Sequence, residues 1–248
     1  MSQGLLAATR YLTIVPVPGA SRGGLESVGR AAPWFPVVGL FIGAVLLLVE
    51  GATAWLFPPL LASLLVVTAW KLLTGGLHLD GLADCLDGLV GHDPAHRLAI
   101  MRDSRIGAFG AIGLILFLLL EVAALAEIGR VERWRALVAA PVIGRAVPAL
   151  LGRLFPPARS DGQGAAFRGA LVSAAAPIGI AVAALVAVLA LGAFGVVALA
   201  VALLAACGLA GFLVTRLGGI TGDVLGAAVE IAELAVLLTV AAWVHARA

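Results

Sequence analysis

Long apolar runs separated by short polar segments are the feature that most constrains this chain. Stretches of about 18 or more apolar residues recur along its 248 residues, and a helix of that length can cross a hydrocarbon core of about 30 Å. Hydrophobic residues make up 62% of the chain and charged residues only 12%, against about 25% charged in a soluble globular domain. The sequence therefore predicts an all-α, polytopic integral membrane protein.

Seven transmembrane helices, with short amphipathic helices beside them, are expected from these runs. The predicted spans are residues 35–57, 59–74, 107–127, 136–152, 172–191, 195–216 and 224–244. The second and fourth are short for a bilayer. Residues 1–18 are too short to cross and contain Pro16 and Pro18, which predicts an interfacial or cytoplasmic helix. No soluble domain interrupts the chain, so one membrane-embedded domain is expected over residues 1–248.

The arginines predict the orientation, because cytoplasmic loops are enriched in basic residues. With the N-terminus inside, ten arginines fall on the inner side: Arg10, Arg22, Arg30, Arg97, Arg102, Arg105, Arg153, Arg159, Arg168 and Arg216. Four fall outside: Arg130, Arg133, Arg135 and Arg247. In this topology the segments 75–106, 153–170 and 217–230 begin or lie on the cytoplasmic face. These segments hold nearly all the polar motifs, which predicts a shared site there.

Three aspartates in the segment GGLHLDGLADCLDGLVG pose the first chemical question. Asp80, Asp84 and Asp87 fall within a stripe about 60° wide on a helix, and carboxylates placed so closely repel one another. A hard cation such as Mg²⁺, which takes oxygen ligands and retains waters that a phosphate can replace, would make the stripe tolerable. Asp103, from the next polar segment, could complete the site. The alternative is an exposed acidic face with solvated charges.

Arginines near the aspartates predict phosphate binding. A short helix that Asp93 is expected to cap should carry Arg102 and Arg105 back toward the membrane, and a guanidinium offers a planar fork for phosphate oxygens. Arg159 lies in the glycine-rich segment GRLFPPARSDGQGAAF, which predicts a loop close to an anion. A plain connection between helices is an equally good interpretation of that segment.

Other polar residues allow two interpretations each. Asp223 could cap the last helix or contact substrate, whereas Glu230 lies deeper in an apolar span, where an acid without a partner is costly. His78 could be a metal ligand, a substrate hydrogen-bond donor or an interfacial polar residue.

Arg145 lies inside the fourth span and should face the bundle interior, with Glu121 or Glu230 as its partner. Glu50 and Glu121 are otherwise expected near the outer interface.

Several segments together resemble one enzyme family. TGGLHLDGLADCLDG, IMRDSRIGAFG, ARSDGQGAAF and GGITGDVLGA are similar to signature stretches of the cobalamin synthases, the adenosylcobinamide-GDP ribazoletransferases of bacterial vitamin B12 assembly. The resemblance extends to RYLTIVPVP and FPVVGLFIGA near the N-terminus. It implies a Mg²⁺-dependent enzyme of the bacterial inner membrane whose site faces the cytoplasm. Its implied reaction joins adenosylcobinamide-GDP to α-ribazole or its 5′-phosphate and releases GMP.

The resemblance also assigns roles to residues. It implies a metal and catalytic set of Asp80, Asp84, Asp87 and Asp103. Substrate contacts are then expected from His78, Arg102, Arg105, Arg159, Asp223 and Glu230. The expected partners are these small molecules and the lipid bilayer; the net charge of +2 argues against nucleic acid, and an oligomer stays open.

Two rival functions have specific signatures. CDP-alcohol phosphotransferases carry D-x-x-D-G-x-x-A-R followed by G-x-x-x-D-x-x-x-D. Here Asp84, Asp87 and Gly88 fit the first half, but Val90 and Gly91 replace the A-R pair. A transporter would place its acids near the bilayer midplane, whereas the densest acidic cluster here is expected at the cytoplasmic end.

Overall fold

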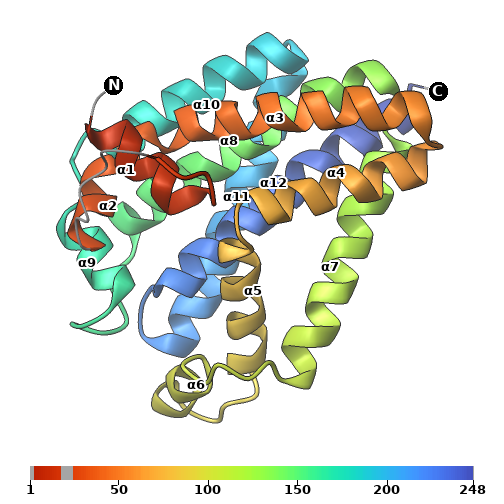
Figure 1. Cartoon of the computed structure of the whole chain (residues 1–248). Coiled ribbons are helices and arrows are strands. Elements are labelled where there is room, and N and C mark those ends of the chain that lie inside the picture. The colour runs from red at the N-terminus through yellow and green to blue at the C-terminus, as the bar shows by residue number, and fades with distance from the viewer. Residues whose placement is uncertain (1–2, 18–24, 248) are drawn as a thin grey trace.

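The computed structural model describes residues 3–17 and 25–247, which form helices and their connections (Figure 1). Arg22 lies outside the described residues. The first elements are α1 (Gln3–Leu12), α2 (Leu25–Ala31), the 3-10 helix η1 (Ala32–Trp34), α3 (Phe35–Leu56) and α4 (Pro59–Leu73). They are followed by α5 (Leu77–Gly88), α6 (Pro94–Ile100), α7 (Ala108–Glu127) and α8 (Arg130–Leu154). The last are α9 (Gln163–Gly169), α10 (Ala175–Leu191), α11 (Phe194–Leu217) and α12 (Gly222–His245).

Every predicted span corresponds to a helix, but not every helix is long enough to cross a membrane by itself. Within the described residues, five helical segments have the length and hydropathy of a span: Ser27–Leu56, Ala108–Glu127, Arg130–Leu154, Phe194–Leu217 and Gly222–His245. A sixth would combine α4 with α5, and α10 has only 17 residues. The all-α membrane class is therefore confirmed, whereas the count of seven spans is not.

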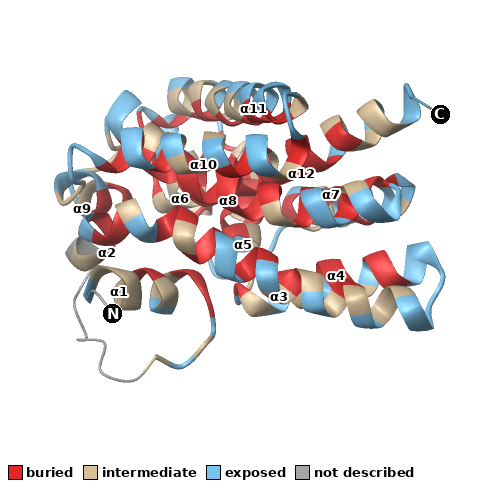
Figure 2. Cartoon of the chain, turned by 90° about the horizontal axis from the view of Figure 1, so that it is seen from above, coloured by how far each residue is buried: buried red, intermediate tan, exposed pale blue. Residues whose placement is uncertain are grey.

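Helices α8 and α12 form the centre of the bundle (Figure 2). In an apolar 18-residue stretch of α8 and of α12, 78% and 72% of the residues are buried. In the corresponding stretches of α7 and α11, only 33% are buried. The outer helices expose large apolar side chains such as Leu189 and Leu204. An apolar surface of this extent is expected where the surrounding solvent is lipid.

Two adjacent glycines turn the chain sharply between α4 and α5. Gly75 and Gly76 have φ angles of 63° and 67°, a left-handed conformation that a residue with a Cβ adopts only at a cost. The axes of α4 and α5 differ by 91° as a result. This corner directs the aspartate-bearing helix α5 away from α4 and against α12.

Helix α8 is longer than predicted. It begins at Arg130 rather than near residue 136 and keeps Pro141 and Pro148 inside 25 helical residues. The basic cluster at 130–135 is therefore the first part of a helix and not an outer loop. Arg133 within it is buried, and its Nη1 lies 3.0 Å from Oε1 of Glu50. Its charge is neutralised inside the protein, so it is a poor indicator of orientation.

Candidate functional site

The three polar segments predicted to share a face meet around one cavity, here called the basic cavity. Its volume is about 230 Å³. Its lining comes from the end of α6, the loop and start of α9, and the start of α12: Met101, Arg102, Arg159, Asp161, Gly162, Gln163, Gly164, Ala165, Ile220, Thr221, Gly222 and Asp223. Segments more than a hundred residues apart in the chain thus build one site.

Backbone hydrogen bonds hold two of these segments together. The N–H of Ala158 donates to the carbonyl of Ile220 at 2.9 Å, and the N–H of Ile220 donates to the carbonyl of Pro156 at 2.8 Å. A Cβ at Gly219 would lie 2.4 Å from the nitrogen of Ala158, so only glycine permits this approach. The pairing fixes the Arg159 loop beside the start of α12.

Thr221, not Asp223, caps α12. Its hydroxyl accepts the N–H of Val224 at 3.2 Å and donates to Oδ2 of Asp223 at 3.1 Å. The capping alternative for Asp223 is therefore wrong, because a neighbouring side chain occupies that role. The Asp223 carboxylate instead lines the basic cavity.

A second cavity, here called the aromatic cavity, adjoins the first. Its volume is about 100 Å³, and it shares Gln163, Gly222 and Asp223 with the basic cavity. The rest of its lining is mostly apolar, with two polar residues from α5: Tyr11, Leu12, Phe35, Leu77, His78, Asp80, Pro148, Phe167, Leu225 and Gly226. The two cavities therefore have a common wall that carries a carboxylate.

Carboxylates without basic partners gather where α5 meets α12. Asp80 is exposed, and Asp84 and Asp223 are partly buried. The negative charges of Asp80, Asp223 and Asp87 all act on Asp84. A Cβ at Gly81 would lie 2.8 Å from the backbone oxygen of Asp223, so glycine lets the two helices touch here.

Among the described residues, no lysine or arginine forms an ion pair with Asp80, Asp84 or Asp223. The positive charge of Arg159 acts on Asp223 from beyond ion-pair distance. Oxygen donors that carry uncompensated charge are the donor set that Mg²⁺ prefers. The ligand oxygens of Asp80, Asp84 and Asp223 do not all come within 4.8 Å of one another. Because Mg²⁺ usually takes one or two carboxylates and keeps waters for a phosphate to replace, two of these residues would be enough to hold it.

Asp87 has a different environment from the rest of the stripe. Its Oδ2 accepts the N–H of Gly107 and its Oδ1 accepts the N–H of Gly110, both at 2.8 Å. A Cβ on either glycine would lie within 2.4 Å of a carboxylate oxygen. Asp87 thus holds the start of α7 against α5. A metal bound to Asp87 would have to share the carboxylate oxygens with the N–H groups of Gly107 and Gly110.

Asp103 and Arg105 pair with each other outside both cavities. Arg105 donates from Nη2 to Oδ2 of Asp103 at 2.6 Å and from Nε to Oδ1 at 3.0 Å. These bonds, followed by one from the Arg105 backbone N–H, lower the pKa of Asp103 to about 2. With Asp87 they line a separate depression. The structure therefore does not bring the predicted ligand Asp103 or the predicted phosphate contact Arg105 to the α5–α12 carboxylates.

Arg102 and Arg159 are the predicted phosphate contacts that do reach the basic cavity. None of the described carboxylates forms an ion pair with either guanidinium. Two unpaired guanidinium groups beside unpaired carboxylates suit an anion that is bound together with a divalent cation.

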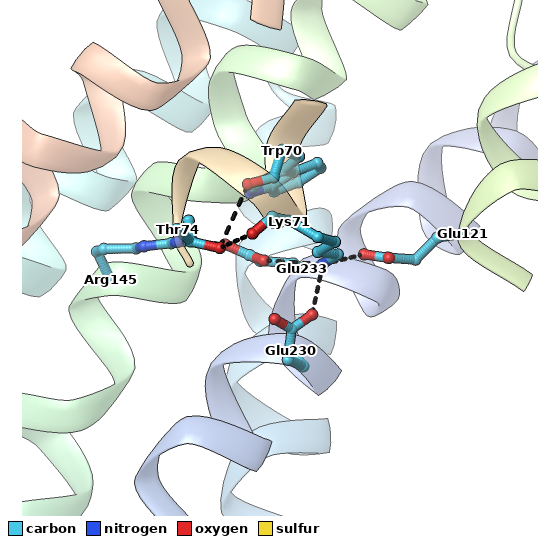
Figure 3. Close-up of polar contacts among 7 residues, drawn as sticks. All are labelled: Trp70, Lys71, Thr74, Glu121, Arg145, Glu230 and Glu233. Carbon is cyan, nitrogen blue, oxygen red and sulfur yellow. Dashed lines mark hydrogen bonds and ion pairs between the residues drawn. The ribbon is translucent and has the colours of Figure 1, made fainter. Parts of the chain in front are cut away.

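A second polar group lies deep in the bundle and is here called the buried charge cluster (Figure 3). It consists of Lys71, Glu121, Arg145, Glu230 and Glu233. Lys71 donates to Oε1 of Glu121 at 2.9 Å and to Oε2 of Glu230 at 2.5 Å, and Arg145 pairs with Glu233. Every side chain in it is at most 9% exposed.

The buried charge cluster corrects several expectations. The partner of Arg145 is Glu233 and neither Glu121 nor Glu230. Glu50 and Glu121 are fully buried inside the protein, and each has a cationic partner: Arg133 for Glu50 and Lys71 for Glu121. Glu230 lines neither cavity, and its bond to Lys71 indicates a structural role in place of the predicted substrate contact. The carboxylates of Glu121, Glu230 and Glu233 lie within 4.8 Å of one another, but Lys71 already supplies the cation between them.

Sequence reasoning overlooked three residues that the structure brings to these centres. Lys71 is the chain's one lysine, and its position in an apolar span was a usable signal, because an intramembrane charge needs a partner. Tyr11 and Gln163 line the cavities from α1 and α9. No local pattern marked these two, since only the tertiary fold brings them to the site.

Comparisons with known proteins identify the family of the chain. The family model described as cobalamin-5-phosphate synthase matches residues 4–241. A relative from Pseudomonas paraeruginosa is 41% identical, with 96% of this chain and 98% of the relative covered. Relatives from Roseiflexus and Geotalea daltonii are 40% and 39% identical and cover 94% and 95% of this chain, and 87% and 95% of their own lengths. All three are named adenosylcobinamide-GDP ribazoletransferase. No solved structure matches the chain.

Proposed function

The chain belongs to the cobalamin-5-phosphate synthase family, and from this premise we propose that it joins adenosylcobinamide-GDP to α-ribazole or its 5′-phosphate and releases GMP. This is the nucleotide-loop assembly step of cobalamin biosynthesis. The observation that carries the proposal is that the unpaired carboxylates of Asp80 and Asp223 line two adjoining cavities, one of which holds two unpaired arginines. The charges of both carboxylates act on the unpaired carboxylate of Asp84. A diphosphate bound with a divalent cation matches that combination of charges.

Arg102 and Arg159 bind the diphosphate of adenosylcobinamide-GDP in the basic cavity. Their planar guanidinium groups can each donate two parallel hydrogen bonds to phosphate oxygens. Transfer between phosphate esters depends mainly on positioning and on stabilising charge around the phosphorus. The loop between α8 and α9 therefore contributes by holding Arg159 rigidly opposite Arg102.

Asp80, Asp84 and Asp223 would hold Mg²⁺, with Asp87 behind them as the residue that fixes α7 against α5. When bound, the ion supplies charge neutralisation to the diphosphate and to the leaving GMP. Asp103 stays a predicted contributor, but its pairing with Arg105 makes the three acids at α5 and α12 the stronger candidates.

The reaction needs an acceptor for one proton. A hydroxyl of the ribazole attacks the phosphorus attached to cobinamide, a new P–O bond forms, and the bond from that phosphorus to the oxygen of GMP breaks. An aspartate oxygen that no cation occupies accepts the hydroxyl proton. Asp223, the carboxylate on the wall shared by the two cavities, is placed for this role.

The chain is proposed to reside in the bacterial inner membrane with this site facing the cytoplasm. The excess of arginines on the predicted inner segments supports this orientation. Cysteines introduced at positions 93 and 163 should both react with an impermeant reagent from the cytoplasmic side only. Labelling of the two positions from opposite sides would contradict a common cytoplasmic site.

The activity itself is tested with purified protein in nanodiscs. GMP release from adenosylcobinamide-GDP should require α-ribazole or its phosphate, and EDTA should abolish it. Asp93→Asn is a matched control, because Asp93 accepts the His96 N–H at the start of α6 and otherwise pairs with the exposed His92, and asparagine caps almost as well. GMP release that is independent of the acceptor would contradict the proposal.

A further inference from the structure

Three aromatic rings from distant parts of the chain line one side of the aromatic cavity. Tyr11 of α1 and Phe35 of α3 have ring centroids 6.2 Å apart, and Phe35 and Phe167 of α9 have centroids 6.1 Å apart. The angles between the ring planes are only 19° and 26°. Nearly parallel rings beside the aliphatic residues Leu12, Leu77 and Leu225 form a surface that suits a flat apolar ring system.

A buried histidine in the lining of the same cavity has a polar atom without a partner among the described residues. His78 lines the cavity, is 4% exposed, and its Nδ1 has no hydrogen-bond partner. Leaving a buried polar group unsatisfied is costly, and such groups are rare in folded proteins. A ligand with a hydroxyl or a ring nitrogen would satisfy it. The atom is therefore an independent indication that a polar ligand group enters here.

The two cavities differ in the charge of their lining residues, so they should bind different ligands. Within residues 3–17 and 25–247, no lysine or arginine lines the aromatic cavity, whereas Arg102 and Arg159 line the basic cavity. The charged residues in the described lining of the aromatic cavity are the acids Asp80 and Asp223. Burial, and then the Asp223 charge, raise the pKa of Tyr11, so its hydroxyl stays protonated. The described lining thus offers an anionic group no cationic side chain, whereas its apolar surface suits a neutral group.

We infer that the aromatic cavity binds the neutral heteroaromatic base of the acceptor nucleoside, with Tyr11, Phe35 and Phe167 as the residues that select it. This assignment rests on the proposed function, in which the acceptor is α-ribazole, a dimethylbenzimidazole nucleoside. The donor diphosphate then occupies the basic cavity. Because Asp223 and Gly222 belong to both linings, a base in the aromatic cavity places the ribose at the wall that faces the diphosphate.

Substitutions that remove aromatic surface should raise the KM for the acceptor and not the KM for the donor. Tyr11→Leu and Phe167→Leu are each expected to raise the KM for α-ribazole roughly ten-fold, through lost ring contact and area. The KM for adenosylcobinamide-GDP should change less than about two-fold, within the context-dependent variation expected of a side chain that does not touch the donor. Phe194→Leu is the matched control, since this ring stacks on Trp243 with centroids 4.4 Å apart and lines neither cavity.

Inhibition of the unmodified protein by the free base gives a readout that does not depend on any variant folding. Dimethylbenzimidazole should compete with α-ribazole and should not compete with adenosylcobinamide-GDP. Competition with the donor, or no inhibition at concentrations well above the KM for α-ribazole, would overturn the assignment. A rise in the donor KM alone in the two leucine variants would overturn it as well.

Failure of this assignment differs from failure of the proposed function. If the unmodified protein releases no GMP with any acceptor, the proposed function fails. If it is active but the leucine variants keep the acceptor KM of the control, the function stands and the base binds elsewhere.

Discussion

Two groups of acids in this protein have opposite relations to their cations. In the buried charge cluster, Glu121, Glu230 and Glu233 contact Lys71 or Arg145 directly. At the junction of α5 and α12, the carboxylates of Asp80, Asp84 and Asp223 have no such partner among the described residues. The first group therefore has cations of its own inside the apolar bundle.

The comparison indicates which acids belong to function. An acid in a membrane is costly unless paired, so acids with internal partners are explained by folding. Acids that repel each other beside a cavity gain no such stabilisation from folding, and we propose that a bound cation supplies it. We expect substitutions in the two groups to produce different losses: stability in the buried charge cluster, and activity at the α5–α12 junction.

Removing the central cation of the buried charge cluster should have the largest effect. Lys71→Met leaves Glu121 and Glu230 buried without their shared donor, and breaking a buried ion pair from one side costs about 3–5 kcal/mol. We expect a large fall in thermal stability in detergent or nanodiscs. The double variant Lys71→Met with Glu230→Gln should recover part of it, because it removes one of the unpaired charges. A Lys71→Met protein as stable as its parent would remove the basis of the comparison.

Neutralising an acid at the junction should reduce activity without reducing stability. In Asp84→Asn and Asp80→Asn, the site loses a charge that holds the cation, and a metal contributes several kcal/mol to such transfers, so we expect a fall in kcat/KM of about 10²-fold or more. Thermal stability in EDTA should be unchanged or higher, because like charges no longer repel. Near-normal turnover in both variants would show that the aspartate stripe is a solvated helix face with no role in the reaction.

Asp87 should respond differently from its two neighbours in the stripe. Both of its oxygens accept backbone N–H groups of α7, and an asparagine can accept with only one of its two terminal atoms. Asp87→Asn should therefore lower the free energy of unfolding by about 1–3 kcal/mol, the cost of an unsatisfied buried donor. The free energy of unfolding should be measured in EDTA, because a difference that remains without divalent metal cannot come from lost metal binding. An Asp87→Asn variant that matches Asp84→Asn in stability would show that the stripe acts as one unit.

The smallest of these effects concerns the arginines of the basic cavity. Arg102→Lys and Arg159→Lys keep the charge and lose the planar fork, so the KM for adenosylcobinamide-GDP should rise roughly ten-fold with little change for the acceptor. Arg105→Lys is the informative control, because Arg105 pairs with Asp103 outside both cavities. If the KM for adenosylcobinamide-GDP rose more in Arg105→Lys than in Arg159→Lys, the phosphate would be bound in the depression lined by Asp103 instead.

Much of this organisation could be predicted from the sequence. Apolar run length predicted the helices, and the Asp93 cap of α6 is confirmed, because both depend on local patterns. The pairing inside the bundle could not be predicted, since the partner of Arg145 depends on how α8 and α12 are rotated. The different environment of Asp87 could not be predicted either. Helical spacing predicts that the three aspartates share a face, but it does not predict that Gly107 and Gly110 of the α7 segment approach one of them.

The central claim is that Mg²⁺ binds the carboxylates at the junction of α5 and α12. The most direct test is to find which acids are needed for Mg²⁺ to stabilise the protein. Thermal unfolding with and without Mg²⁺ should be measured for the unmodified protein, Asp84→Asn and Glu230→Gln. A ligand at 100 times its Kd stabilises the folded state by about 2.7 kcal/mol, so Mg²⁺ should raise the Tm of the unmodified protein. The same rise is expected in Glu230→Gln, whatever its starting Tm, and little or none in Asp84→Asn. A Mg²⁺ response that survives in Asp84→Asn and disappears in Glu230→Gln would place the ion in the buried charge cluster and contradict the account.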